Sequence, residues 1–339
     1  MSETPEAHDH TADQDTAQAL HAHALVIDAH ADILCDVRVR RRAGETAVLG
    51  RHHLPRLRAG GFGGVVFAIY LTPYLPESAL RESLLQIDDL QEEIAESEGA
   101  VYLAHSAADL APTTRRGRVA ALLSLEGAEP LGTDLGILRL MYQLGVRVLG
   151  LTWARRTMVA DGTGEEEAGG GLTRFGRAVV RECGRLGILV DVSHLSERGF
   201  WDVMEVAGGP VIASHSNARG LCDHRRNLRD DQLRAIAASG GAVGLNTCRE
   251  FVDPVAPSLE RLLDHATHMS EVMGSGHVGL GLDFLEYLPG YEGQAVPGLA
   301  NAAEAAAITA RLLARGVGAA DVRGILGENW LQVWRQVLR

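Results

Sequence analysis

The amino-acid sequence predicts an α/β fold, and within that class a single (β/α)8 or TIM barrel. Eight apolar runs of strand length alternate with segments that have the periodicity of amphipathic helices. Each run is almost continuously apolar, which is typical of parallel strands that are covered on both faces. The 339 residues are enough for one such barrel. A doubly wound open sheet is the alternative that the same alternation allows.

The expected strands and helices follow one another along almost the whole chain. The strands are Leu25–His30, Gly64–Leu71, Val119–Glu126, Arg147–Trp153, Ile188–His194, Pro210–Ser216, Gly241–Asn246 and His277–Phe284. The helical segments between them carry apolar residues on one side and polar residues on the other. They are Leu80–Glu98, Thr173–Leu186, Ser196–Val206, Asp231–Ala238, Ser258–Met273 and Ala300–Ala314.

We expect one domain, residues 19–339, preceded by a short tail. Residues 1–18 hold five acids and, after Met1, almost no large apolar side chain. Such a segment cannot bury enough surface to order itself, so we predict a disordered acidic tail. At the other end, a helix over Asn329–Leu338 follows the break at Gly327.

Composition and charge exclude several classes of function. The net charge of −12 argues against nucleic-acid binding and against an anionic membrane surface as partner. All 32 basic residues are arginine, which excludes Schiff-base chemistry and a carbamylated lysine that bridges two metals. The four cysteines are scattered, and no apolar run has the length of a signal peptide core or a membrane span. We therefore expect a soluble, cytoplasmic protein with reduced thiols.

Five of the eight expected strands end in a residue that can bind a metal ion, either a histidine or an acid. Barrels build their active sites at the carboxyl ends of the strands, so these side chains should meet. Residues two apart in a strand point the same way, which places the carboxylate of Asp32 beside the imidazole of His30 at the end of the first strand. The residues are His30, Asp32, Glu126, His194, His215 and Asp283.

Imidazole nitrogen and carboxylate oxygen both suit zinc. A site for one metal needs three protein ligands, whereas three histidines and three acids suffice for two metals if one carboxylate bridges them. Glu126 is the natural bridge because it has two oxygens and lies among the ligand strands. Two metals would share a water molecule acidic enough to become a hydroxide near neutral pH. Asp283 would then be the carboxylate that handles the proton beside it.

Short segments in matching order and spacing carry a resemblance to a known family. They are Asp28-Ala-His-Ala-Asp32, Leu125-Glu-Gly127, Leu151-Thr-Trp153, Ala160-Asp-Gly162, Asp191-Val-Ser-His194, Ile212-Ala-Ser-His-Ser-Asn217, Arg225-Arg-Asn227, His277-Val-Gly-Leu-Gly-Leu-Asp-Phe284 and Gly327-Glu-Asn329. From about Val26 to Trp334 the chain resembles the membrane (renal-type) dipeptidase family, zinc peptidases of family M19. The resemblance implies a barrel of the metal-dependent, amidohydrolase-like hydrolase type.

The resemblance also implies roles for single residues. His30 and Asp32 look like ligands of one zinc ion, His194 and His215 like ligands of a second, and Glu126 like the bridge. Asp283 matches the acid that activates the bridging water and then protonates the leaving amine. Arg226 matches the arginine that holds the free carboxylate of the substrate, a task that suits the guanidinium fork. A homodimer is expected from the resemblance alone.

Trp153 departs from the pattern of the family, which often has a histidine there that contacts substrate. The resemblance thus implies that this chain has the zinc ligands of the family, but a different substrate pocket that contains Trp153. These observations predict a binuclear zinc hydrolase that cleaves a dipeptide or a small dipeptide-like conjugate. Two alternatives stay open: the same chemistry on another small amide, such as a lactam or a modified peptide, and a metal-binding scaffold without catalysis.

Overall fold

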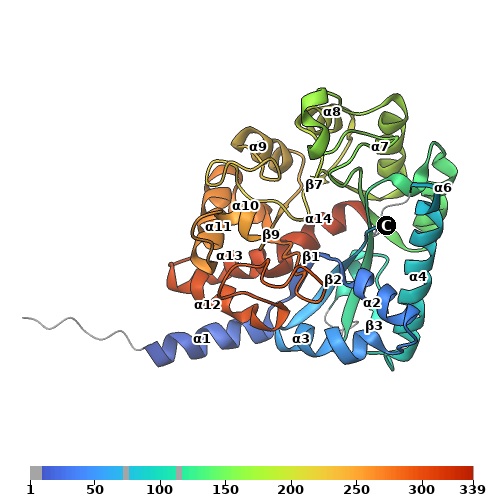
Figure 1. The fold of residues 1–339 in the computed structure, drawn as a ribbon. Coiled ribbons are helices and arrows are strands. Elements are labelled where there is room, and N and C mark those ends of the chain that lie inside the picture. Colours follow the sequence, from blue (N-terminus) through green and yellow to red (C-terminus); the bar gives the residue numbers. More distant parts are fainter. Residues whose placement is uncertain (1–9, 72–75, 112–116, 339) are drawn as a thin grey trace, which may run out of the picture.

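The computed structural model describes residues 10–71, 76–111 and 117–338. Eight parallel strands form the barrel in the order β7-β6-β5-β4-β2-β1-β9-β8, with helices around it (Figure 1). A parallel bridge between Ala213 and Val243 connects the two ends of this order, so the barrel is nearly closed. The predicted TIM barrel is confirmed, and the doubly wound alternative is wrong.

All eight expected runs overlap a strand of the barrel. The strands are β1 (Val26–Ala31), β2 (Phe62–Ile69), β4 (Val119–Glu126), β5 (Val146–Gly150), β6 (Leu189–Asp191), β7 (Val211–Ile212), β8 (Val243–Leu245) and β9 (Val278–Leu280). One further strand, β3 (Val101–Leu103), pairs with the first residues of β4 outside this order. Its three residues are too few to show a pattern in the sequence.

Helices cover the outside of the barrel and one of its ends. They are α1 (His10–His23), α2 (Ile33–Arg42), α3 (Leu54–Ala59), α4 (Ala79–Glu96), α6 (Leu135–Gln143), α7 (Arg174–Leu186), α8 (Glu197–Val206), α9 (Asp230–Ala238), α10 (Arg249–Val252), α11 (Leu259–Met273), α12 (Ala306–Ala314), α13 (Ala319–Arg323) and α14 (Asn329–Val337). None of the helices in the described ranges is long and apolar enough to span a membrane.

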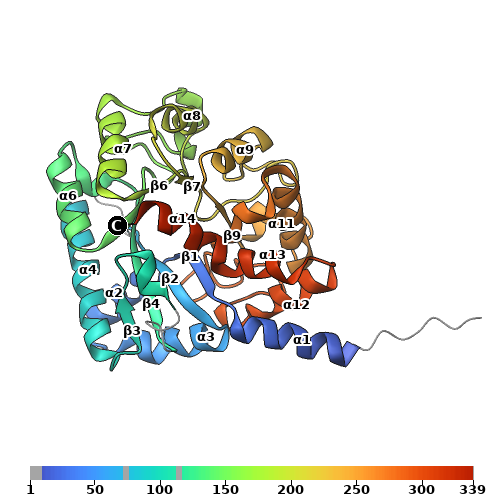
Figure 2. The same ribbon diagram turned by 180° about the vertical axis from the view of Figure 1, so that it is seen from behind.

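The last helix, α14, closes the amino-terminal end of the barrel (Figure 2). Its buried Trp330 and Trp334 pack with Ile27, Leu122 and other residues that point into the barrel. The indole nitrogen of Trp330 also donates a hydrogen bond to the carbonyl of Leu280 at 2.9 Å. The polar carboxyl ends of the parallel strands meet at the opposite end of the barrel, which α14 leaves open.

The expected disordered tail is partly wrong, because α1 begins at His10. This helix packs against α12 (Figure 1), and Ala17 is buried. His21 anchors it through Nδ1 to Thr309 Oγ1 at 2.7 Å and Nε2 to the carbonyl oxygen of Gly60 at 3.0 Å. These tertiary contacts stabilise a helix that the composition of the segment does not predict. Residues 1–9 of the expected tail lie outside the described residues.

Two glycines allow the closing seam between β7, β8 and β9 to form. A Cβ on Gly244 would lie 2.0 Å from the carbonyl oxygen of Ser214, and one on Gly281 would lie 1.7 Å from the same oxygen. The close approach lets the amide of Ser216 donate to the carbonyl of Gly244 at 2.8 Å. The seam therefore brings the segment that carries His215 next to the segment that carries Asp283.

Candidate metal centre

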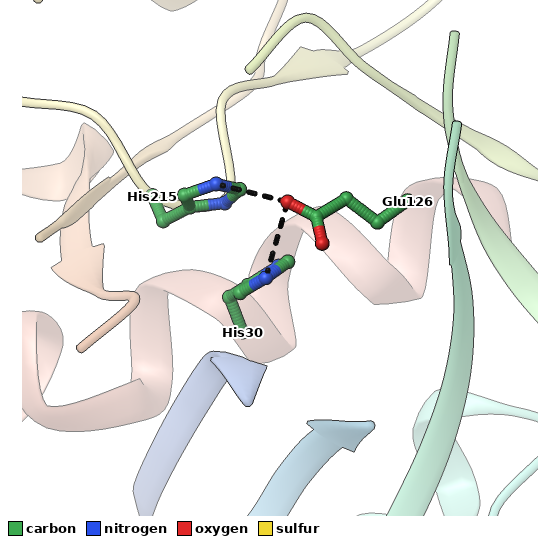
Figure 3. A group of neighbouring side chains, drawn as sticks. All are labelled: His30, Glu126 and His215. Carbon is green, nitrogen blue, oxygen red and sulfur yellow. Dashed lines mark ion pairs between the residues drawn. The ribbon is translucent and has the colours of Figure 1, made fainter. Parts of the chain in front are cut away.

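Three buried side chains from distant parts of the sequence converge at the carboxyl ends of the strands (Figure 3). His30 belongs to β1, Glu126 is the last residue of β4, and His215 follows β7. The Nε2 atoms of His30 and His215 each lie 3.6 Å from Glu126 Oε1. The centroids of the two imidazole rings are 3.8 Å apart. Glu126 Oε1 thus lies beside both histidines and faces the Nε2 atom of each (Figure 3).

The other two predicted ligands lie beside these three. His194 Nε2 is 3.0 Å from Glu126 Oε1 and 2.8 Å from His215 Nε2. Asp32, just beyond β1, places Oδ1 3.9 Å from His30 Nε2. The structure therefore brings all five predicted ligands together.

Asp283 completes the group at the end of β9. Its carboxylate, the carboxylate of Asp32 and the ring of His30 offer ligand atoms within 4.8 Å of one another. Asp283 Oδ2 accepts a hydrogen bond from Asn246 Nδ2 at 3.0 Å. Asn246 is held in turn, because its Oδ1 accepts from the amide of Cys248 at 2.7 Å. No role was predicted for Asn246, whose only signal in the sequence is its position at the end of an expected strand.

His194 and Asp283 share an unusual backbone conformation. Their φ angles are +65° and +54°, in the left-handed region that residues with a side chain rarely adopt. Such strain persists only where the surrounding structure enforces it, and it is concentrated at functional sites. The backbone thus aims these two side chains at the cluster at an energetic cost.

Two buried aspartates hold the strand ends in place. Asp28 Oδ1 accepts from the amides of His30 at 3.2 Å and Leu282 at 2.8 Å, which connects β1 to the segment before Asp283. Asp191 Oδ1 accepts from the amides of Ser193 at 2.9 Å and Ser214 at 3.0 Å in the same manner. Each aspartate thus fixes the backbone at, or directly next to, two of the predicted site residues. Both aspartates lie in segments that carry the family resemblance, but no role was predicted for either. The signal available in the sequence was an acidic residue inside an apolar strand.

The electrostatics of the cluster call for a cation. Burial and the neighbouring Asp283 carboxylate raise the pKa of Asp32 well above its usual value. Burial and the carboxylates of Asp32 and Asp283 raise the pKa of Glu126 in the same way. Burial lowers the pKa of His30 to about 3 and that of His194 and His215 well below the usual range. Arg226 compensates the charge of these acids only in part, while the imidazoles are neutral, as metal ligation requires.

Several buried polar atoms of the cluster also lack hydrogen-bond partners among the described residues. A buried polar atom without a partner is costly, so an ion that satisfies several at once stabilises the site. The atoms are His30 Nε2, Asp32 Oδ1, Glu126 Oε2 and His194 Nδ1. Nitrogen and oxygen donors of this kind fit zinc.

The two predicted substrate residues lie on either side of His194. Arg226 is buried, and its Nη2 donates to the carbonyl of His215 at 3.0 Å. With His194 it lines a cavity of about 200 Å³. The Trp153 ring lies 5.7 Å from the His194 ring and 5.5 Å from the ring of Tyr70, centroid to centroid. The structure therefore places Trp153 at the metal centre, together with Tyr70, which the sequence analysis did not single out.

A parallel barrel whose strand ends converge on imidazoles and carboxylates defines the class of metal-dependent hydrolases. The sequence profile described as "Membrane dipeptidase (Peptidase family M19)" matches residues 14–339, and the chain belongs to this family of metallopeptidases. The resemblance identified in the sequence is confirmed.

Individual relatives agree with this assignment. Dipeptidase tcpJ of Claviceps purpurea (strain 20.1) is 32% identical over 315 residues, 89% of this chain and 73% of that protein. A crystal structure of a metallo peptidase from Rhodobacter sphaeroides, liganded with a phosphinate mimic of the dipeptide L-Ala-D-Ala, is 31% identical with a TM-score of 0.84. It covers 93% of this chain and 99% of its own. An amidohydrolase from Pseudomonas aeruginosa, 24% identical with a TM-score of 0.82, shares the fold.

Proposed function

We propose that this protein is a binuclear zinc dipeptidase that hydrolyses the amide bond of a dipeptide or a small dipeptide-like conjugate with a free carboxylate. The observation that carries the proposal is the convergence of His194, His215 and His30 on one oxygen of Glu126, with Asp283 beside them. The similarity to a peptidase liganded with a dipeptide mimic supports the substrate class.

The residues fit two metal ions that share one carboxylate. His30 and Asp32 would hold one zinc ion, His194 and His215 the other, and Glu126 would bridge them. When bound, the two ions supply Lewis acidity that polarises the amide carbonyl and lowers the pKa of a water molecule. The burial of the cluster strengthens this effect because few water molecules screen the charges.

Asp283 is suited to move a proton between water and the leaving amine. Burial raises the pKa of Asp283 to about 6, although Asn246 and Arg226 act to lower it. A carboxyl group with a pKa near the working pH can both accept and donate a proton. The hydrogen bond from Asn246 to Oδ2 holds the Asp283 carboxylate beside His30 and Asp32.

Arg226 is suited to bind the carboxylate of the substrate. Its guanidinium is buried beside the cluster, and its Nε has no hydrogen-bond partner in the described part of the chain. A buried guanidinium binds a carboxylate through charge-assisted hydrogen bonds and orients it. This contact would place the scissile amide over the metal ligands, with Trp153 covering the acyl side.

A dipeptide-hydrolysis screen with zinc-loaded protein tests this function. The panel contains L- and D-residues at the carboxyl side, Cys-Gly conjugates, and a lactam. We expect release of free amino acids from dipeptides and none from dipeptide amides. Hydrolysis of the lactam alone, or of nothing by fully metallated protein, would contradict the proposal. The homodimer and the cytoplasmic location stay predictions from the sequence.

A further inference from the structure

A second arginine, Arg155, lies at the metal centre on the side away from Arg226. Strand β6, which leads to His194, lies between β5 and β7 in the barrel. Arg155 follows β5, whereas Arg226 binds the carbonyl of His215 beyond β7. The two guanidinium groups therefore flank His194.

Arg155 is fixed in this place by aromatic residues. Its Cζ lies 4.9 Å from the centroid of the Trp153 ring, which itself lies beside His194. Arg155 also forms a hydrogen bond with Tyr70, whose ring packs against Trp153. All three side chains are partly exposed, so they form a wall of the site that a bound molecule can reach. We refer to Tyr70, Trp153 and Arg155 as the Arg155 wall.

The positive charge of this wall lies opposite one acid of the described residues. Arg155 forms an ion pair with Glu129, in which Arg155 Nη2 lies 3.8 Å from Glu129 Oε1, beyond the distance of a hydrogen bond. Both carboxylate oxygens of Glu129 are buried without a hydrogen-bond partner in the described residues. Burial raises the pKa of Glu129, although the charge of Arg155 acts to lower it. About 28% of the Arg155 side chain remains accessible.

We propose that Arg155 determines specificity on the acyl side and selects dipeptides whose amino-terminal residue carries an anionic side chain. The inference rests on the proposed function, because Arg226 must hold the carboxyl-terminal end. With that end fixed on the β7 side of His194, the amino-terminal residue extends toward β5 and the Arg155 wall. A guanidinium there forms charge-assisted hydrogen bonds with a side-chain carboxylate and repels a cationic side chain.

Isosteric pairs of substrates isolate this contact. Glu-Ala is compared with Gln-Ala, and Asp-Ala with Asn-Ala, so that each pair differs in charge but hardly in shape. We expect the wild type to prefer the acidic member in kcat/KM by about tenfold to a hundredfold. In Arg155→Gln this ratio should fall to about 1.

Two further variants sharpen the test. Glu129→Gln removes the opposing acid and should raise the preference for Glu-Ala. Arg81→Gln is the matched control, because Arg81 lies on α4 with 73% of its side chain exposed and pairs with the adjacent Glu82. This control should keep the wild-type ratio. Melting temperatures verify that each variant is folded.

The outcomes separate this inference from the proposed function. Equal hydrolysis of both members of each pair by the wild type, or a preference that survives in Arg155→Gln, overturns the role of Arg155 alone. Failure to hydrolyse any dipeptide overturns both proposals. Binding gives a second readout: phosphinate mimics of Glu-Ala and Gln-Ala should differ in Kd in the wild type and bind equally to Arg155→Gln.

Discussion

Replacing Asp283 with asparagine tests the proton-transfer step with little change in structure. Asparagine is nearly isosteric with aspartate and tolerates the left-handed φ of +54° at this position. Its side-chain oxygen can still accept the hydrogen bond from Asn246 Nδ2, now 3.0 Å from Asp283 Oδ2. The carboxylate is lost, and with it the ability to take up and release a proton.

The expected loss follows from that single function. A positioned acid or base contributes a rate factor of about 10² to 10⁴, or about 2.7 to 5.5 kcal/mol in activation free energy. We expect Asp283→Asn to lower kcat by this factor. The effect on KM should be small, because Arg226 and the other ligands stay in place.

Amino-acid release from a cleaved dipeptide measures kcat, and metal content and melting temperature are measured in parallel. Asp223→Asn is a suitable control, because the Asp223 side chain is 84% exposed and its one ion pair within the described residues is with Arg219. A kcat within about threefold of wild type, with full metal content, would refute the role of Asp283.

Three further predictions follow from other parts of the structure. Arg226→Gln should raise KM for dipeptides about 30-fold or more because it leaves the substrate carboxylate unpaired, and steady-state kinetics would refute this role if KM did not change. Gly281→Ala should lower the free energy of unfolding by about 1–3 kcal/mol, because its Cβ meets the Ser214 carbonyl at 1.7 Å; an unchanged denaturant midpoint would contradict this. Hydrogen bonds from Arg185 and Arg139 lower the pKa of Glu182 from its usual 4.5 to about 2, so its contribution to stability is present above pH 4.5 and lost as the pH falls toward 2. The difference in melting temperature between wild type and Glu182→Gln should therefore shrink over that range, and a constant difference would exclude this linkage.

Much of the barrel and its metal centre could be predicted because both depend on local sequence patterns. A buried parallel strand needs a run of apolar residues, and the barrel geometry then brings the residues that end such runs together. His30, Glu126 and His215 follow directly from this rule, although they lie far apart in the chain.

The remaining features depend on contacts that no local pattern records. Helix α1 is anchored near its carboxyl end by a hydrogen bond between His21 and Thr309, which lie 288 residues apart in the chain. The orientation of Asp283 depends on Asn246, which reads in the sequence as an ordinary residue at a strand end. Arg155 is held by its contacts with Trp153 and Tyr70, and these contacts between side chains cannot be read from the sequence alone.

The metal content of the purified protein, determined by mass spectrometry together with activity, tests the central claim most directly. We expect about two zinc ions per chain, loss of dipeptide hydrolysis when a chelator removes them, and recovery when zinc is restored. Glu126→Gln should weaken the binding of both ions, because Glu126 Oε1 lies within 3.6 Å of Nε2 of His30, His194 and His215. Protein that binds no metal tightly, or that hydrolyses dipeptides equally well after chelation, would contradict the account.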